Sequence, residues 1–265
     1  MAGTLSRCGS WIGRLLAGYL TRPHRRYETF AATDVARLRA ALQPGDVLLI
    51  EGNTRISTAI KYLTQSSWSH AALYVGNALA HHSQWQGELV EADLVNGVIA
   101  IPLSTYANFN TRICRPVGLS DTDRDRIVAQ VISRLGHQYD LRNIIDLLRY
   151  LLPAPPVPSW MRRRMLAFGS GDPTRGICST IIAEAFQSIR YPILPLSGTD
   201  CGDDGADCLK KRHYSHFVPR DFDLSPYFAV VKPTLAIGFD FRQLRWQPEA
   251  EASEPARARA SSFAP

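Results

Sequence analysis

The sequence predicts an α+β domain, on the basis of three observations about the order of its apolar segments. Short apolar runs separated by turn residues fill residues 46–117 and predict an antiparallel sheet. Apolar residues at helical spacing then fill residues 120–190. Residues 227–232 form a last β-type run that returns to the sheet. Strands first, helices next and a closing strand are typical of the α+β class.

The strands are predicted from apolar runs that end at turn residues. We expect them at residues 46–50, 71–75, 89–92, 98–101 and 111–117. Pro44-Gly45 is the turn that leads into the first strand, and Gly76-Asn77 ends the second. Asn96-Gly97 is one of the strongest hairpin signals and joins the third strand to the fourth.

The helices are predicted from apolar periodicity and from capping residues. We expect them at residues 33–42, 120–135, 140–152 and 178–190. Ser120 is a typical N-cap with Asp123 in the first turn, and Gly136 ends that helix. Pro153 stops the next one. We expect residues 191–214 to form a long irregular loop.

The chain divides into three parts by composition. Residues 1–43 form a basic, amphipathic helical arm in which Leu5, Cys8, Ile12, Leu15 and Tyr19 recur at helical steps. Residues 44–246 form the α+β domain. Residues 247–265 are rich in Ala, Glu, Arg, Ser and Pro, a composition that predicts a disordered tail.

The positive charge of the chain is concentrated in the arm. The formal net charge is +6, the pI is near 9.2, and residues 1–27 hold five arginines and no acidic residue. Such a helix can lie on an anionic membrane surface, or it can pack on its own domain with solvated arginines; the sequence leaves both open. It contains no nucleic-acid motif with interleaved aromatic residues, so we expect no nucleic-acid partner.

The cellular location is predicted from the length of the apolar runs and from the spacing of the cysteines. Arg14 interrupts the apolar run of the arm before it reaches signal-peptide length, and no run reaches about 18 residues. The five cysteines are irregularly spaced and do not form a disulfide framework. We therefore expect a cytoplasmic protein, which would be peripheral on the inner membrane surface if residues 1–27 bind the membrane.

Cys178 is the candidate nucleophile because it opens a predicted helix. The positive end of the helix dipole lowers the pKa of a thiol there, and the first-turn N–H groups can stabilise an oxyanion. Taken alone, Cys178 is more simply a small buried apolar residue. His70 stands at the mouth of an otherwise apolar strand, where a thiolate is a suitable partner. If the next strand pairs with it, Glu91 can accept the other imidazole N–H and fix its tautomer.

Five segments in this order resemble one family. They are Gly45-Asp46-Val47-Leu48-Leu49, Ser69-His70-Ala71-Ala72-Leu73-Tyr74-Val75-Gly76, Val90-Glu91-Ala92, Tyr139-Asp140 and Cys178-Ser179. The set resembles the permuted papain-like amidases of the NlpC superfamily, and most of all the YiiX/YebB-type "lipo-like" proteins. Lecithin retinol acyltransferase is a more distant relative. The resemblance covers roughly residues 44–232.

The resemblance implies a permuted papain-like fold with the nucleophile at a helix N-terminus. It implies Cys178 as nucleophile, His70 as base and Glu91 as the orienting residue, and it places Tyr139 near the substrate. The sequence departs from the family pattern at Ala71-Ala72, where many relatives have glycine, and at Ser179-Thr180, where an acidic residue is common. Neither departure removes a catalytic group.

Two other sets of residues are weighed against this site. His81 or His82 could replace Glu91 as the third member, since related enzymes use histidine there. The alternative zinc set is Cys201, Cys208, His213 and His216; its spacing lies outside the usual zinc-finger range, so we do not expect it to bind zinc. We expect neither a metal in the site nor a cofactor.

The function predicted is that of a cysteine-dependent amidase or acyl hydrolase, or an acyltransferase. It would act through a thioester acyl-enzyme on a peptide-amide or lipid-linked substrate. The alternative is a catalytically inactive membrane-surface binding protein built on the same fold. The sequence does not determine the substrate, the acyl acceptor or the oligomeric state.

Overall fold

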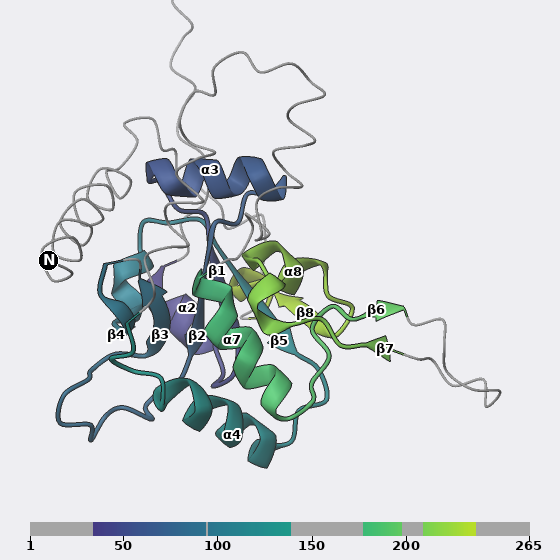
Figure 1. The fold of residues 1–265 in the computed structure, drawn as a ribbon. Coiled ribbons are helices and arrows are strands. Elements are labelled where there is room, and N and C mark those ends of the chain that lie inside the picture. The colour runs from purple at the N-terminus through teal and green to yellow at the C-terminus, as the bar shows by residue number, and fades with distance from the viewer. Residues whose placement is uncertain (1–33, 94, 139–176, 198–208, 237–265) are drawn as a thin grey trace, which may run out of the picture.

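The computed structural model describes residues 34–93, 95–138, 177–197 and 209–236 (Figure 1). Six strands form one sheet in the order β4-β3-β2-β1-β5-β8, and every neighbouring pair is antiparallel. The strands are β1 Val47–Ile50, β2 His70–Tyr74, β3 Leu89–Asp93, β4 Gly97–Ile101, β5 Thr111–Pro116 and β8 Phe228–Val231. This antiparallel sheet with its helices confirms the predicted α+β class.

The helices differ in length and in how well they were predicted. They are α2 Val35–Ala41, α3 Arg55–Thr64, α4 Asp121–Ile132, α7 Ile177–Ser188, α8 Pro219–Leu224 and α9 Pro233–Ala236. Two 3₁₀ helices, η1 Leu103–Tyr106 and η2 Tyr214–His216, and a small hairpin of β6 Leu196–Ser197 with β7 Leu209–Lys210 complete the described elements. Within the described ranges, no helix is long and apolar enough to cross a bilayer.

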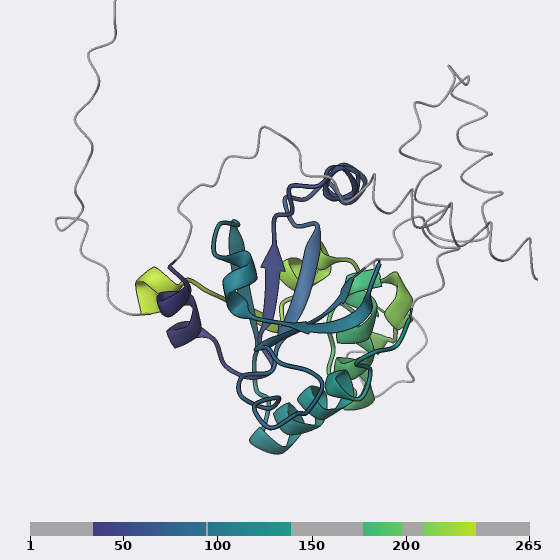
Figure 2. The ribbon, with the colours of Figure 1, turned by 90° about the vertical axis from the view of Figure 1, so that its left-hand side faces the viewer.

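The sheet separates two apolar layers, because side chains alternate between the faces of each strand. On one face Leu49 belongs to a core that includes Phe186 of α7 and reaches α4. On the other face Leu48 packs in a second core with Leu38 of α2 and Leu103 of η1. Figure 2 shows the two layers, with α2 in purple and α7 in green on opposite sides of the strands. The candidate residues of β2 and β3 therefore have protein on both sides.

Local signals explain where several elements begin and turn. The Ser120 hydroxyl accepts the N–H of Asp123 and caps α4, as predicted. The β3–β4 hairpin turns between Asp93 and Gly97, and Asp93 Oδ1 accepts the N–H groups of Val95 and Asn96. Gly97 follows with φ of 76°, and an added Cβ would lie 2.3 Å from the carbonyl oxygen of His137. Only glycine fits this close approach without strain.

The structure differs from the sequence-based expectations at several places, and α8, α9 and both 3₁₀ helices stand where no helix was predicted. Helix α3 was not predicted, because its Ile, Thr and Tyr residues are only moderate helix formers. Helix α4 ends at Ile132, short of residue 135, since the chain turns through residues 133–136. The predicted loop 191–214 contains β6 and β7. The helices predicted at residues 5–19 and 140–152 and the tail 247–265 lie outside the described residues.

Candidate active site

Cys178 is the second residue of α7, and its thiol is buried. The first-turn N–H groups of a helix have no acceptor within the helix, so that of Cys178 is available to another group. Ile182, Ala185 and Phe186 are fully buried on the same helix, which packs on β2 and β3. This apolar anchoring fixes the N-terminal end of α7, and with it the sulfur, against the two strands that carry His70 and Glu91.

His70 is the first residue of β2, and the chain that leads into it is firmly held. Trp68 Nε1 donates to Asp223 Oδ2 of α8 at 3.1 Å. Ser69 Oγ accepts the N–H of Gly52 at 2.9 Å, and Ser69 N–H donates to the carbonyl of Ile50. The imidazole is therefore presented from a fixed backbone.

The β2–β3 ladder is open at the end where Cys178 lies. The strands pair at Leu73–Val90 and Tyr74–Leu89, and no pairing continues toward His70. N–H groups alternate in direction along β2: that of Tyr74 donates to Asp46 on the β1 side, and that of Val75 to Glu88 on the β3 side. The Ala71 N–H therefore points toward β3, and it donates to the sulfur of Cys178. The sulfur therefore accepts the hydrogen bond that a backbone carbonyl of β3 would accept in a continued ladder.

Glu91 lies on β3 on the same face as His70, and it is 6% exposed. Its Oε2 is 2.9 Å from His70 Nε2 and 2.5 Å from the hydroxyl of Tyr106. His70 also hydrogen-bonds Cys178. Because Nε2 faces Glu91, Nδ1 is the nitrogen that remains for the sulfur. The three side chains form a continuous chain from thiol to imidazole to carboxylate.

The proton affinities of the three groups are shifted in the directions that favour an ion pair. Burial raises the pKa of the Cys178 thiol, but the charge and hydrogen bond of His70, the Ala71 N–H and the Ser179 hydroxyl outweigh it, so the pKa lies below its ordinary value. Burial lowers the pKa of His70, yet the charges and hydrogen bonds of Glu91 and Cys178 raise it well above its ordinary value. The arrangement favours a thiolate beside an imidazolium.

Glu91 keeps its charge despite its burial. Desolvation raises the pKa of the carboxyl group, whereas the charge and hydrogen bond of His70 and the hydrogen bond of Tyr106 lower it, and the net pKa is below its ordinary value. An ionised carboxylate can orient the imidazole and stabilise its positive charge.

Of the residues singled out from the sequence, the structure brings together Cys178, His70 and Glu91. Tyr139 lies outside the described residues. His81 and His82 are exposed, and His82 Nδ1 accepts the N–H groups of Gln84 and Trp85 in a turn. Glu91, and not His82, is the partner that the structure places on His70.

Tyr106 is the site residue that sequence reasoning missed. It ends η1, a single 3₁₀ turn, and the sequence around it looks like ordinary core-forming chain. The role of a tyrosine hydroxyl depends on where the ring lies in the fold. The sequence around Tyr106 has no periodicity from which that position can be predicted.

Two members of the alternative zinc set lie within the described residues. Cys201 and Cys208 lie outside the described residues, whereas His213 is the N-cap of η2 and His216 is its last residue, with ring centroids 5.9 Å apart. Among the described residues, no group of three or more His, Cys, Asp or Glu side chains is placed to hold a metal ion.

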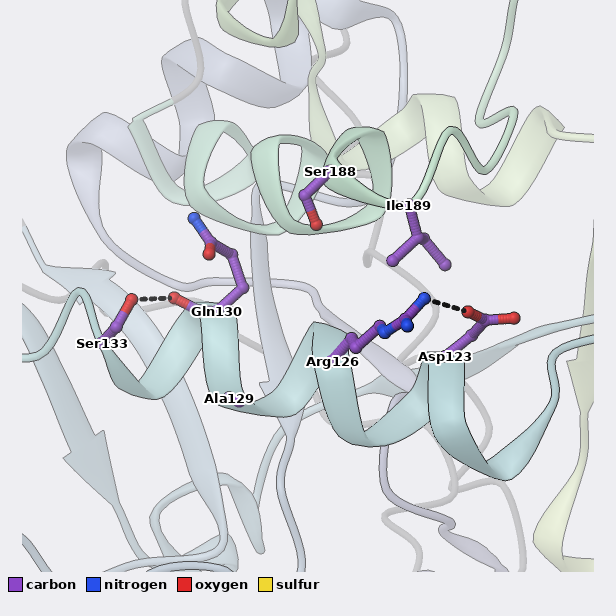
Figure 3. A pocket seen from close by; sticks show the side chains of 7 residues that line it. All are labelled: Asp123, Arg126, Ala129, Gln130, Ser133, Ser188 and Ile189. Atoms are coloured by element: carbon purple, nitrogen blue, oxygen red, sulfur yellow. Dashed lines mark hydrogen bonds and ion pairs between the residues drawn. The ribbon is translucent and has the colours of Figure 1, made fainter.

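A surface pocket between α4 and the C-terminal end of α7 is separate from this site (Figure 3). Arg126 on its wall is held by Asp123, and Ser188 and Ile189 border it from the other side. Ser188 is ten residues from Cys178 along α7, or about 15 Å at the helical rise per residue. The pocket therefore cannot contribute groups to the chemistry at the sulfur.

A buried thiol at a helix N-terminus, an imidazole on an adjoining strand and a carboxylate behind it define a papain-like cysteine site, here with histidine before cysteine in the chain. Residues 41–148 match the family described as "Permuted papain-like amidase enzyme, YaeF/YiiX, C92 family". Over these residues the chain is similar to the permuted papain-like amidases. The matched segment includes His70 and Glu91 and ends before Cys178.

Comparison with solved structures gives a more distant similarity. The structure titled metalloprotein YiiX from Escherichia coli O157:H7 is 16% identical, with a TM-score of 0.44, over 72% of this chain and 97% of that chain. No curated protein matches the chain.

Proposed function

We propose that the protein is a cysteine-dependent amidase or acyl hydrolase in which Cys178 is the nucleophile. The observation that carries this proposal is the hydrogen bonding of one imidazole, His70, to both the Cys178 thiol and the Glu91 carboxylate. A buried structural cysteine does not need such a partner, whereas an activated nucleophile does. The family over residues 41–148 supports the same reaction class.

The first step begins from the ion pair. The thiolate of Cys178 attacks the carbonyl carbon of an amide or ester, a sulfur–carbon bond forms, and the carbonyl oxygen becomes an oxyanion. The backbone N–H of Cys178 stabilises that oxyanion. Because the pKa directions place the proton on His70 before attack, His70 acts first as an acid.

The second step releases the leaving group. His70 Nδ1 gives its proton to the departing nitrogen or oxygen, the bond from carbon to that atom breaks, and a thioester remains on Cys178. Water then yields hydrolysis, whereas an amine or alcohol yields acyl transfer. We propose hydrolysis of a peptide-amide or lipid-linked acyl substrate, with acyl transfer as the variant outcome at the same site.

The experiment that tests this proposal is the pH dependence of alkylation of Cys178, followed by peptide mass spectrometry. We expect fast labelling at neutral pH, and a fall of about tenfold or more in His70→Ala, because the thiolate loses its counter-ion. Cys114 is an internal reference, since burial raises the pKa of its thiol to about 12. The Cys114→Ala variant is the matched control and should leave the rate at Cys178 unchanged.

The opposite outcome has a definite meaning. If Cys178 reacts as slowly as Cys114 and His70→Ala changes nothing, the nucleophile assignment is wrong. An inactive membrane-surface binding protein is then the better account.

We also propose that residues 1–27 hold the protein on the inner face of a membrane. The support is their charge, five arginines with no acidic residue. Sedimentation with vesicles containing anionic lipid tests this: the full chain should bind, and a variant with these arginines replaced by glutamine should not. Equal binding by both would contradict the proposal.

A further inference from the structure

Tyr106 makes the second hydrogen bond to the oxygen of Glu91 that faces His70. Its hydroxyl donates to Glu91 Oε2 at 2.5 Å, and the same oxygen is 2.9 Å from His70 Nε2. The Tyr106 ring centroid is 6.2 Å from that of His70. Tyr106 thus touches the orienting carboxylate without contacting the sulfur.

The backbone around Tyr106 is fixed by contacts unrelated to the site. Leu103, three residues earlier in η1, is fully buried in the second core, and its N–H donates to Glu88 Oε2 at 2.9 Å. The Tyr106 ring packs edge-on against Phe109, with centroids 5.5 Å apart. The hydroxyl is therefore held in place before it meets Glu91, as a positioning group must be.

We propose that Tyr106 is a positioning residue that keeps Glu91 ionised and aligned on His70, so that the site works at acidic as well as neutral pH. The effect on the working pH of the site rests on the proposed function. The effect of Tyr106 on the protonation of Glu91 does not depend on it.

The reason lies in the solvation of a buried carboxylate. Glu91 has lost its water and would take up a proton unless donors replace it. Three elements supply the groups that face it: His70 from β2, Tyr106 from η1 and, through His70, Cys178 from α7. Asp93, on the same strand as Glu91, acts on Tyr106. Tyr106 is the neutral donor in this set, so its hydrogen bond persists whatever the charge of His70.

The shifts in proton affinity agree with this role. Burial and the charge of Glu91 raise the pKa of Tyr106, so the hydroxyl stays protonated and donates. Its hydrogen bond is among the interactions that lower the pKa of Glu91.

The test follows the carboxyl ¹³C signal of Glu91 in the full chain during a pH titration, with the signal assigned by its loss in Glu91→Gln. In Tyr106→Phe, which keeps the ring, we expect the titration midpoint to rise by about one pH unit, a tenfold gain in proton affinity. Tyr74→Phe is the matched control. It removes a hydroxyl from the same core, where the carboxylates that act on Tyr74 are Glu88 and Asp46 rather than Glu91, and it should leave the midpoint unchanged.

Alkylation of Cys178 supplies the functional readout. The acid limb of the rate profile should move to higher pH in Tyr106→Phe and not in Tyr74→Phe. In a Glu91→Gln background, Tyr106→Phe should add no further displacement. An unchanged midpoint in Tyr106→Phe, or an equal displacement in the Glu91→Gln background, would overturn the inference. If the midpoint rises as expected while Cys178 is unreactive in the wild type, the inference stands and the proposed function fails.

Discussion

At Ala71 a backbone N–H that would close a rung between β2 and β3 donates to a side-chain sulfur. Buried N–H groups need an acceptor, and a neutral thiol is a poor one. The thiolate form of Cys178 is a much better acceptor. The open ladder therefore contributes to the lowered pKa of Cys178 independently of His70.

At the residue scale, we predict that the charge of Glu91 affects the reactivity of Cys178. Glu91→Gln keeps the shape of the side chain but removes the charge that stabilises the imidazolium. We expect alkylation of Cys178 at neutral pH to slow by about tenfold. Glu51→Gln is the matched control, because Glu51 binds Lys61 and Asn110. Equal slowing in both variants would contradict the role of Glu91.

The same carboxylate predicts a pH dependence of stability. The pKa of Glu91 is lower in the folded state than its ordinary value. The ionised form of Glu91 therefore stabilises the fold at pH values above the unfolded-state pKa, which is about 4.3. That contribution is lost as the pH falls through the folded-state pKa. Urea unfolding should show the wild type more stable than Glu91→Gln at neutral pH, with a difference that narrows below about pH 4. A constant difference would count against a lowered pKa.

At the scale of elements, two glycines with nearly the same φ serve different purposes. Gly97 and Gly118 have φ of 76° and 77°. A Cβ on Gly97 would meet the carbonyl of His137, whereas a Cβ on Gly118 would meet no atom within 4 Å. Val98 N–H also donates to that carbonyl, so Gly97 lets the β3–β4 hairpin lie against the end of the α4 segment.

This pair separates strain in the backbone from collision between segments. Gly118→Ala should cost about 1–2 kcal/mol of unfolding free energy, the left-handed penalty alone. Gly97→Ala should cost about 1–3 kcal/mol more, because it also forces the hairpin away from His137. Urea unfolding measures the free energy of both variants. Equal losses of unfolding free energy would show that the close approach to His137 adds no cost.

At the scale of the whole molecule, the sheet holds two cores, and the candidate site lies where they meet. Cys178 comes from the helix layer of the first core, whereas Tyr106 comes from the η1 layer of the second. His70 and Glu91 lie on strands between the two layers. The site is complete only when both layers are packed on the sheet.

Phe186 is the residue by which α7 is most deeply anchored. Its ring is fully buried and lies within 5.2 to 6.4 Å of the rings of Tyr191, Phe222 and Phe228, centroid to centroid. Phe186→Ala should lower the free energy of unfolding by about 3–5 kcal/mol. Tyr62→Ala, at a side chain 76% exposed, is the control and should change it by less than about 0.5 kcal/mol. A loss below 1 kcal/mol at Phe186 would mean that α7 is held by other contacts.

The sequence was sufficient for features that depend on local patterns and on residue order. Each of the six sheet strands overlaps a predicted apolar run, and the cap at Ser120 was predicted from its residue type. Helix α3 could not be predicted from its own residues. Tyr106 and the Ala71 N–H were out of reach for another reason: their roles depend on a 3₁₀ turn and on a gap in a ladder, which no local pattern encodes.

The order of the site residues along the chain has a consequence for synthesis on the ribosome. His70, Glu91 and Tyr106 all belong to the first part of the chain, and the elements that carry them, β2, β3 and η1, precede α7. Because synthesis proceeds from the N-terminus, these three groups leave the ribosome before Cys178 does. The contacts with His70 and Ala71 that lower the pKa of Cys178 form only when α7 packs on β2 and β3, so a chain still being made lacks them.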